Sequence, residues 1–276
     1  MKQLTIEPIQ GGDSAQTFSS LDQAGDGEAY VNHNCPVCRK EASPFLKKNG
    51  YWIDRCPECG FAFVRDVPSR QTVAKFYENS YSGENGVFKP PTRLTRRITK
   101  AAENWCWARV IKRHAEGRSK LLEIGCGEGH LLKALVQAGF EVEGLDYGRS
   151  VVDYLHSLGL NVVQGDILDQ NYPPDSFEFL VGFHVLEHVQ NLDEFMSEVR
   201  RVLAPEGRIY FVVPCLTHYA AILAGPKWRY FGPPGHLWYF SVKAMKMFLS
   251  GWQFRILSVH CFSNRSHLMA LAEKTG

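Results

Sequence analysis

The chain has 276 residues, of which 45% are apolar and 22% are charged, as in ordinary globular proteins. Its formal net charge is +2, so overall charge indicates neither a nucleic acid nor an anionic membrane as partner. No stretch reaches the roughly 18 apolar residues that a membrane span requires, and the first residues lack a signal-peptide pattern. We therefore expect a cytoplasmic protein with no membrane partner.

The N-terminal part contains a candidate metal site. Residues 1–30 are rich in Gly, Asp, Ser and Gln without periodicity, which predicts a mobile tail. Residues 31–66 carry two C-x2-C pairs at a spacing typical of a four-thiolate zinc ribbon. A segment this short cannot bury a sufficient core, so bound zinc would supply part of its folding free energy. The predicted zinc ligands are Cys35, Cys38, Cys56 and Cys59.

We expect this zinc to be structural, because four thiolates leave no coordination position open for catalysis. A redox pair is the alternative, but each C-x2-C has a matching partner and neither lies in a thioredoxin-like context. The other four cysteines fall singly in apolar or glycine-rich sequence, and disulfides are unusual in cytosolic proteins. We interpret Cys106, Cys126, Cys215 and Cys261 as incidental.

Residues 67–117 are predicted to form a helical connector and lid. The segment VAKFYENSYSGENG predicts a short helix and a glycine loop, in which Tyr77 and Tyr81 are candidates to close over an active site. A long helix is expected between Pro91 and Gly117. One of its faces is basic, which is typical of a solvated helix; a phosphate-binding face is the alternative.

From residue 118 onward, apolar strands alternate with helices. KLLEIGC, FEVEGLDY and GRIYFVVP predict strands, whereas GHLLKALVQAG and NLDEFMSEVRRVLAPEG predict helices. This alternation predicts an α/β fold with a Rossmann-like, doubly wound and mostly parallel sheet, covered by helices on both faces. The domain would span residues 118–276, with an insertion at about 215–240 and a final helix and two strands after it.

The first strand of this sheet runs into a glycine turn, LLEIGCGEGHLL. Its glycines follow G-x-G-x-G rather than the G-x-G-x-x-G of nicotinamide-binding proteins. A carboxylate, Glu123, stands where a pyrophosphate would come close, which is unfavourable for phosphate and favourable for a cation. The candidate cofactor-binding residues of this turn are Glu123, Gly125, Gly127 and Gly129.

Polar residues also follow the next two strands, at the sheet edge where ligands bind in such folds. Asp146 ends the second strand and is placed to accept hydrogen bonds from both hydroxyls of a ribose. Tyr147 beside it is placed to stack on an adenine ring. After the third strand, Asp166 is a candidate acceptor for the adenine amino group, and the Ile167 N–H a candidate donor to a ring nitrogen.

Five features in this order resemble the class I S-adenosylmethionine-dependent methyltransferases: the E-x-G-x-G-x-G loop, Asp146, the GDI triplet, the VLEHV segment and the LAPEGRI turn. The match covers residues 118 to about 215. The resemblance implies S-adenosylmethionine as cofactor, with the glycine loop under its methionine part and Glu123 near its ammonium or sulfonium. The methyl group of this cofactor is already activated, so the protein must align the acceptor, exclude water and, for a hydroxyl, remove a proton.

With the ribbon included, the chain is loosely similar to zinc-ribbon methyltransferases of sugar and natural-product pathways. Some of these methylate sugar carbons, and they carry a third domain and a Glu-His pair near its entrance. The corresponding place here reads Gly235-His236, without the carboxylate, and we expect no third domain in a chain that ends at Gly276. This difference favours a hydroxyl acceptor.

Three histidines are weighed as the base that would remove the hydroxyl proton. His236, in a segment bounded by proline and glycine, is the leading candidate, and His184, just past the fourth strand, is the second. His188, on the first turn of the helix expected next, is interpreted as structural. The aromatic residues of the 215–240 insertion are predicted either to wall the acceptor site or to pack as core.

The sequence therefore predicts a methyltransferase that acts on an oxygen of a small molecule: a saccharide, a nucleotide-linked sugar or a secondary metabolite. The alternative is an RNA methyltransferase that uses the ribbon and the basic helix to hold phosphates. A third interpretation is a scaffold that binds the cofactor without turnover.

Overall fold

The computed structural model describes residues 30–32, 34–69, 71–73 and 94–276. The candidate lid residues Tyr77 and Tyr81 lie outside the described residues, as does the expected tail up to residue 29. In the part that is described, no helix combines the length and the apolar character needed to cross a lipid bilayer.

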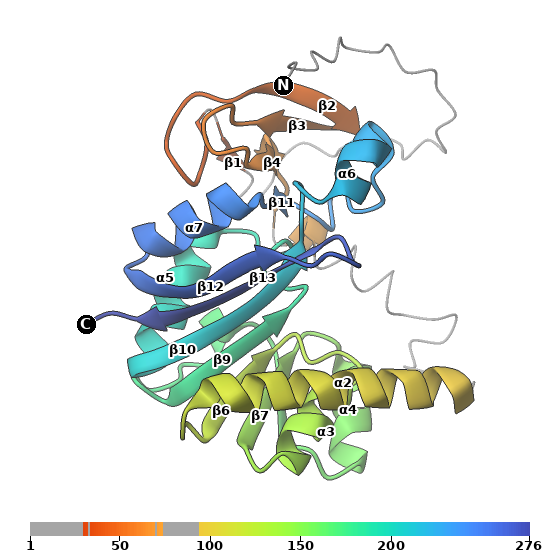
Figure 1. Cartoon of the computed structure of the whole chain (residues 1–276), viewed down its shortest axis with the longest axis vertical. Helices are drawn as coiled ribbons and strands as arrows, with labels where there is room; N and C mark the ends of the chain where they lie inside the picture. The colour runs from red at the N-terminus through yellow and green to blue at the C-terminus, as the bar shows by residue number, and fades with distance from the viewer. Residues whose placement is uncertain (1–29, 33, 70, 74–93) are drawn as a thin grey trace.

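A seven-stranded sheet forms the centre of the molecule (Figure 1). Its strand order is β12-β13-β10-β9-β6-β7-β8, and every strand except β13 runs in the same direction. The strands are β6 (Lys120–Ile124), β7 (Glu141–Asp146), β8 (Val162–Gln164), β9 (Phe177–Phe183), β10 (Leu203–Pro214), β12 (Phe254–Cys261) and β13 (His267–Lys274). The strand order reverses between β6 and β9, so ligands are expected at the carboxyl ends of these two strands.

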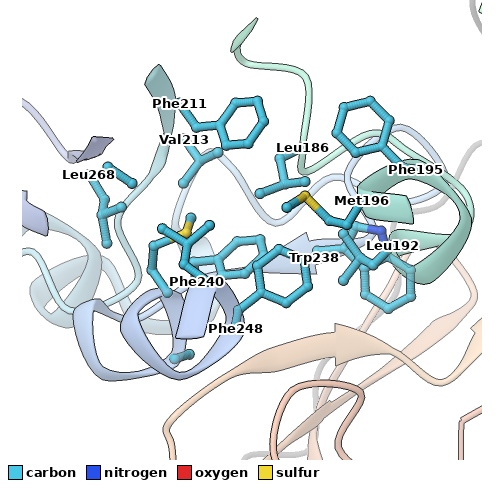
Figure 2. Packing of buried hydrophobic residues seen from close by; sticks show 14 of the residues in the cluster. Leu186, Leu192, Phe195, Met196, Phe211, Val213, Trp238, Phe240, Phe248 and Leu268 are labelled. Carbon is cyan, nitrogen blue, oxygen red and sulfur yellow. The ribbon is translucent and has the colours of Figure 1, made fainter. Parts of the chain in front are cut away.

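Helices cover both faces of this sheet, which confirms the predicted architecture (Figure 1). One face carries α2 (Leu94–Ala115), α3 (His130–Gln137) and α4 (Arg149–Ser157), and the other carries α5 (Leu192–Val202) and α7 (Val242–Gly251). Each face of the sheet has its own hydrophobic core, and successive residues of a strand point into different ones. Leu121 packs with α2, α3 and α4, whereas Leu122 packs with α5 and α7. Figure 2 shows the second core, where Phe211, Phe195 and Phe248 gather from β10, α5 and α7.

The cysteine-rich segment forms a small antiparallel sheet of order β11-β4-β3-β2 above the α5 and α7 face (Figure 1). Its strands are β2 (Ser43–Lys48), β3 (Tyr51–Arg55), β4 (Ala62–Val64) and β11 (Trp238–Tyr239), with a separate short pair formed by β1 (Tyr30–Val31) and β5 (Asp66–Val67). The strand β11 comes from the 215–240 insertion, so that insertion and the N-terminal segment share one sheet. They also share one core, in which Phe61 stacks on Trp238 at a ring-centre distance of 6.3 Å.

The insertion, which contains α6 (Tyr219–Ala224), is mostly core rather than an acceptor wall. Trp228, Phe231, Trp238 and Tyr239 are all buried, and Tyr219 is 60% exposed on the surface.

A disulfide joins Cys215 to Cys261, at the ends of β10 and β12. The interpretation of these two cysteines as incidental is therefore wrong. Their pairing depends on two strand ends that lie far apart in the sequence, which spacing alone does not reveal.

Candidate active site

The glycine loop joins β6 to α3, and its three glycines all have positive φ, which favours glycine. A Cβ atom at Gly125 would lie 2.7 Å from Val185, and one at Gly129 would overlap Leu155. At Gly127, in contrast, no atom lies within 4 Å of the Cβ position. The loop therefore packs tightly at both ends and leaves open space for a ligand at its middle glycine.

Glu123 lies at the carboxyl end of β6 and is only 4% exposed. Its Oε2 is buried and has no hydrogen-bond partner within the described residues. Burial, and secondarily the neighbouring Asp146 carboxylate, raise the pKa of Glu123 well above its usual range. A cationic ligand in this place would pair with the unpartnered oxygen and favour the ionised carboxylate.

Asp146 links the end of β7 to the glycine loop. Its Oδ2 accepts the Gly127 N–H at 2.8 Å, and its Oδ1 accepts the Gly148 N–H at 2.9 Å. Burial raises the pKa of Asp146, and these two hydrogen bonds only partly oppose the effect. A carboxylate oxygen can accept a second hydrogen bond, so Asp146 keeps acceptor capacity for ribose hydroxyls.

Tyr147 and Asp166 lie beside each other near the ends of β7 and β8. The Tyr147 hydroxyl donates to Asp166 Oδ2, while Oδ1 accepts the Leu168 N–H at 3.1 Å and so caps the short turn η1 (Ile167–Asp169). Ile167 is buried, and Tyr147 is 61% exposed. An adenine amino group would therefore have to share Asp166 with the Tyr147 hydroxyl.

A cavity of about 360 Å³ is lined by Glu123 and the glycine loop. The same cavity is lined by His184 at the end of β9, by His267 at the start of β13 and by Trp107 of α2. The structure thus brings the predicted cofactor-binding turn and one of the predicted bases to a single cavity.

A buried carboxylate orients His184. The His184 Nδ1–H donates to Glu187 Oε1 at 2.9 Å, and the Glu187 side chain is fully buried. Burial acts to raise the pKa of Glu187, but the hydrogen bond from His184 and the nearby imidazoles outweigh it and hold the pKa below its usual value. His184 has a φ of 56°, an uncommon conformation for a residue with a side chain, which is frequent at functional sites.

His267 was missed by the sequence reasoning. Its Nε2 is hydrogen-bonded to the Tyr230 hydroxyl at 2.7 Å, and its ring centre lies 4.6 Å from that of His184. Burial lowers the pKa of His267 to about 4, so the ring is neutral near pH 7. Because β13 runs antiparallel to its neighbours, its first residue lies at the edge where the parallel strands end. The direction of this strand is the only signal that could have revealed His267.

His236 lies against His188, with ring centres 4.5 Å apart. Burial, and then the positive potential of His188, lower the pKa of His236 to about 4. Among the described histidines, the cavity is lined by His130, His184 and His267. His184 therefore lies at the cavity surface, whereas His236 is not among the residues that line the cavity.

The four predicted zinc ligands converge. All four sulfur atoms lie within 4.8 Å of one another, with Cys35 and Cys59 at 3.6 Å and Cys38 and Cys56 at 3.4 Å. Tetrahedral zinc with Zn–S bonds of about 2.3 Å holds its sulfurs roughly 3.8 Å apart. The spacing of this cluster therefore fits such an ion.

The basic face of α2 is partly engaged in contacts within the chain. The Lys100 ammonium lies 2.6 Å from the Glu128 carboxylate of the glycine loop, and Lys112 donates to the Ala138 carbonyl at the end of α3. These two cations thus support the cofactor loop and the packing of α2.

Comparison with known proteins places this geometry in a family. Residues 92–259 match the family model described as a methyltransferase domain. A probable S-adenosylmethionine-dependent methyltransferase of Mycolicibacterium smegmatis is 33% identical over 126 residues, which are 42% of this chain and 49% of that protein. A ubiquinone biosynthesis O-methyltransferase of Pseudomonas fluorescens is 32% identical over 115 residues, 39% of this chain and 48% of that protein. The chain spans about half the length of these curated relatives.

Solved structures agree in fold. A SAM-dependent methyltransferase from Archaeoglobus fulgidus superposes with a TM-score of 0.54 at 18% identity, covering 72% of this chain and 99% of that one. The [4+2]-cyclase SpnF superposes with a TM-score of 0.55 at 14% identity, covering 76% and 97%. Because the family model spans more than half of the sequence and the sheet has the expected topology, the chain belongs to the methyltransferase domain family, with the class I S-adenosylmethionine-dependent fold.

Proposed function

We propose that the chain transfers the methyl group of S-adenosylmethionine to a hydroxyl oxygen of a small molecule: a saccharide, a nucleotide-linked sugar or a secondary metabolite. The observation that supports this most is the shared cavity, where Glu123 and the glycine loop lie with a histidine that a buried carboxylate orients. S-adenosylmethionine supplies an activated methyl group, so the residues of the chain must position the acceptor and take its proton.

The cofactor end of the cavity fits this ligand. Glu123 Oε2, which is buried and unpartnered within the described residues, would accept from the ammonium of the methionine part. The open space at Gly127 would admit the cofactor close to the backbone, and Asp146 would accept from the ribose hydroxyls. The adenine would lie beside Tyr147, Asp166 and Ile167.

His184 is the base best placed for the acceptor proton. Its Nδ1–H is held by Glu187, which leaves Nε2 to accept a proton from the hydroxyl. The buried Glu187 carboxylate would stabilise the imidazolium that forms. His236 is the alternative base, but its burial and lowered pKa make it the weaker one. The closing role of Tyr77 and Tyr81 stays a prediction.

The four cysteines at 35, 38, 56 and 59 are proposed to hold a structural zinc ion as thiolates. The close sulfur spacing supports this assignment. Because β4 pairs with β11, the ion would stabilise the insertion as well as the N-terminal segment.

The test is incubation of the purified chain with methyl-labelled S-adenosylmethionine and a cell extract separated into metabolite, polysaccharide, RNA and protein fractions. Label in the metabolite or polysaccharide fraction is the expected result. Label in RNA would support the alternative, in which the ribbon and α2 hold phosphates. Cofactor binding with no label in any fraction would favour the scaffold, since SpnF, which is similar in fold, is described as a cyclase.

A further inference from the structure

A second cluster of metal-ligating side chains lies behind the wall of the cavity. Glu187 and His188 follow β9, whereas His236 comes from the 215–240 insertion. One ligand atom from each of these three side chains lies within 4.8 Å of the other two. Two imidazoles and one carboxylate form the donor set of open divalent-metal sites, in contrast to the closed four-cysteine set of the ribbon.

Two atoms of this cluster are buried without a hydrogen bond. They are Glu187 Oε2 and His236 Nδ1, and neither has a partner among the residues that the structure describes. Buried polar atoms in folded proteins are nearly always paired with protein, water or an ion. Both atoms belong to side chains of the same small cluster, so the cluster has unused polar capacity that a cation would take up.

One ring nitrogen of His188 is hydrogen-bonded to a backbone carbonyl, as is usual for metal-binding histidines. Its Nδ1–H donates to the Gly235 carbonyl at 2.6 Å, and its Nε2 lies 3.9 Å from Glu187 Oε1. A ligating histidine almost always donates its other ring N–H to a carbonyl or carboxylate, which fixes the ring. The contact with Gly235 also holds the neighbouring His236 against the turn after β9.

The charge of the cluster supports a cation as well. Glu187 is fully buried, and its ion-pair partners in the described part of the chain are His184 and His188. No lysine or arginine of that part forms an ion pair with it. A buried carboxylate is costly unless a cation or hydrogen bonds compensate it, and a divalent ion would supply such a charge.

We propose that Glu187, His188 and His236 bind a divalent ion of the zinc or manganese kind, one side chain away from the cavity. Three protein ligands leave coordination positions for water. Because His184 donates to Glu187, an ion on this carboxylate also fixes the orientation of His184. This role in orienting the base rests on the proposed methyl transfer, whereas the metal site itself does not.

The test is Mn²⁺ binding by the full chain without cofactor or acceptor. One equivalent of Zn²⁺ per chain is loaded first, because thiolates prefer zinc and the ribbon takes it. Mn²⁺ is then titrated, and the paramagnetic resonance signal of the free ion is followed. The expected result is one bound Mn²⁺ per chain, displaced by further Zn²⁺. The variants E187Q, H188Q and H236Q should each weaken Mn²⁺ binding at least about tenfold.

The matched control is H260Q, since His260 is exposed on β12 and should leave the affinity unchanged. Thermal unfolding with and without Mn²⁺ shows whether a variant folds, and the ion should raise the midpoint of the native chain but not that of the cluster variants. A native chain that takes no ion beyond the ribbon zinc would overturn the site, as would folded cluster variants that bind like H260Q. Full methyl transfer by a folded chain without this ion would overturn the role of the ion in orienting His184 and leave the proposed function standing.

Discussion

The proposed cofactor end and the proposed acceptor end of the cavity are built in different ways. The cofactor end comes from one strand, one loop and the next strand end, so Glu123, Gly127 and Asp146 lie in a short stretch of sequence. The proposed acceptor end collects His184 and His267, which Tyr230 contacts, from segments that meet only in the folded chain. A site within one supersecondary unit can therefore be predicted from spacing, whereas a site assembled by topology cannot.

Replacing His184 by Gln should have the largest effect, because it should impair the proposed acceptor end and leave the proposed cofactor end intact. We expect turnover to fall about 100- to 10,000-fold, the usual contribution of a positioned base. The affinity for S-adenosylmethionine should stay nearly unchanged, because Glu123 and the glycine loop keep their contacts. Label transfer to the active extract fraction measures turnover, and calorimetric titration measures affinity; H260Q is the control. An equal loss of turnover and of cofactor affinity would contradict the division of the cavity into a cofactor end and an acceptor end.

Replacing Cys38 by Ser tests whether the ribbon serves the acceptor end alone. The strand pairing of β4 with β11 connects the ribbon to the insertion that carries Tyr230 and His236. Loss of the proposed zinc ion should shift those residues, and a misplacement near 1 Å costs about 100-fold in turnover. Cofactor affinity should hold. Zinc content, turnover and affinity are measured together, and full turnover by the zinc-free variant would disprove the connection.

The difference between the two ends also explains what could be predicted from the sequence. The alternation of strands and helices predicted the mostly parallel sheet and its two-sided helical cover, and the C-x2-C spacing predicted the convergence of the four cysteines, because each of these is encoded within short units. Trp238 was considered for the acceptor wall, but it pairs with β4 and donates to the Val189 carbonyl at 2.6 Å. No local sequence pattern predicts that β11 joins a sheet formed by a distant part of the chain.

The loop glycines permit a finer test at the cofactor end. Gly129→Ala combines a positive φ with a clash against Leu155, and should cost about 2–4 kcal/mol of folding free energy. Gly127→Ala meets no neighbour, so its stability cost should be only the strain of about 1–2 kcal/mol. Its methyl group would instead occupy the cofactor space and lower affinity about tenfold, or about 1.4 kcal/mol. Urea unfolding and calorimetric titration compare the two variants, and equal effects on stability would contradict this assignment of space.

The smallest effect should come from Glu123→Gln, because the amide keeps an acceptor oxygen; we expect affinity for S-adenosylmethionine to fall about three- to tenfold. Burial raises the pKa of Glu123, so the free protein holds a proton there that a cationic ligand expels. Affinity should therefore rise with pH until the free carboxyl is ionised, and binding should release a proton. Titrations in two buffers of different ionisation enthalpy measure that proton.

The matched control for this proton is Glu128→Gln in the same cavity. Burial acts to raise the pKa of Glu128, but the Lys100 ammonium holds it below the usual value, so Glu128 is already ionised in the free protein. Its replacement should leave proton release intact, whereas Glu123→Gln should abolish it. Native protein that binds the cofactor without releasing a proton would show that Glu123 does not meet the cationic part of the ligand. The E-x-G-x-G-x-G loop would then indicate the fold but not which group of the cofactor Glu123 contacts.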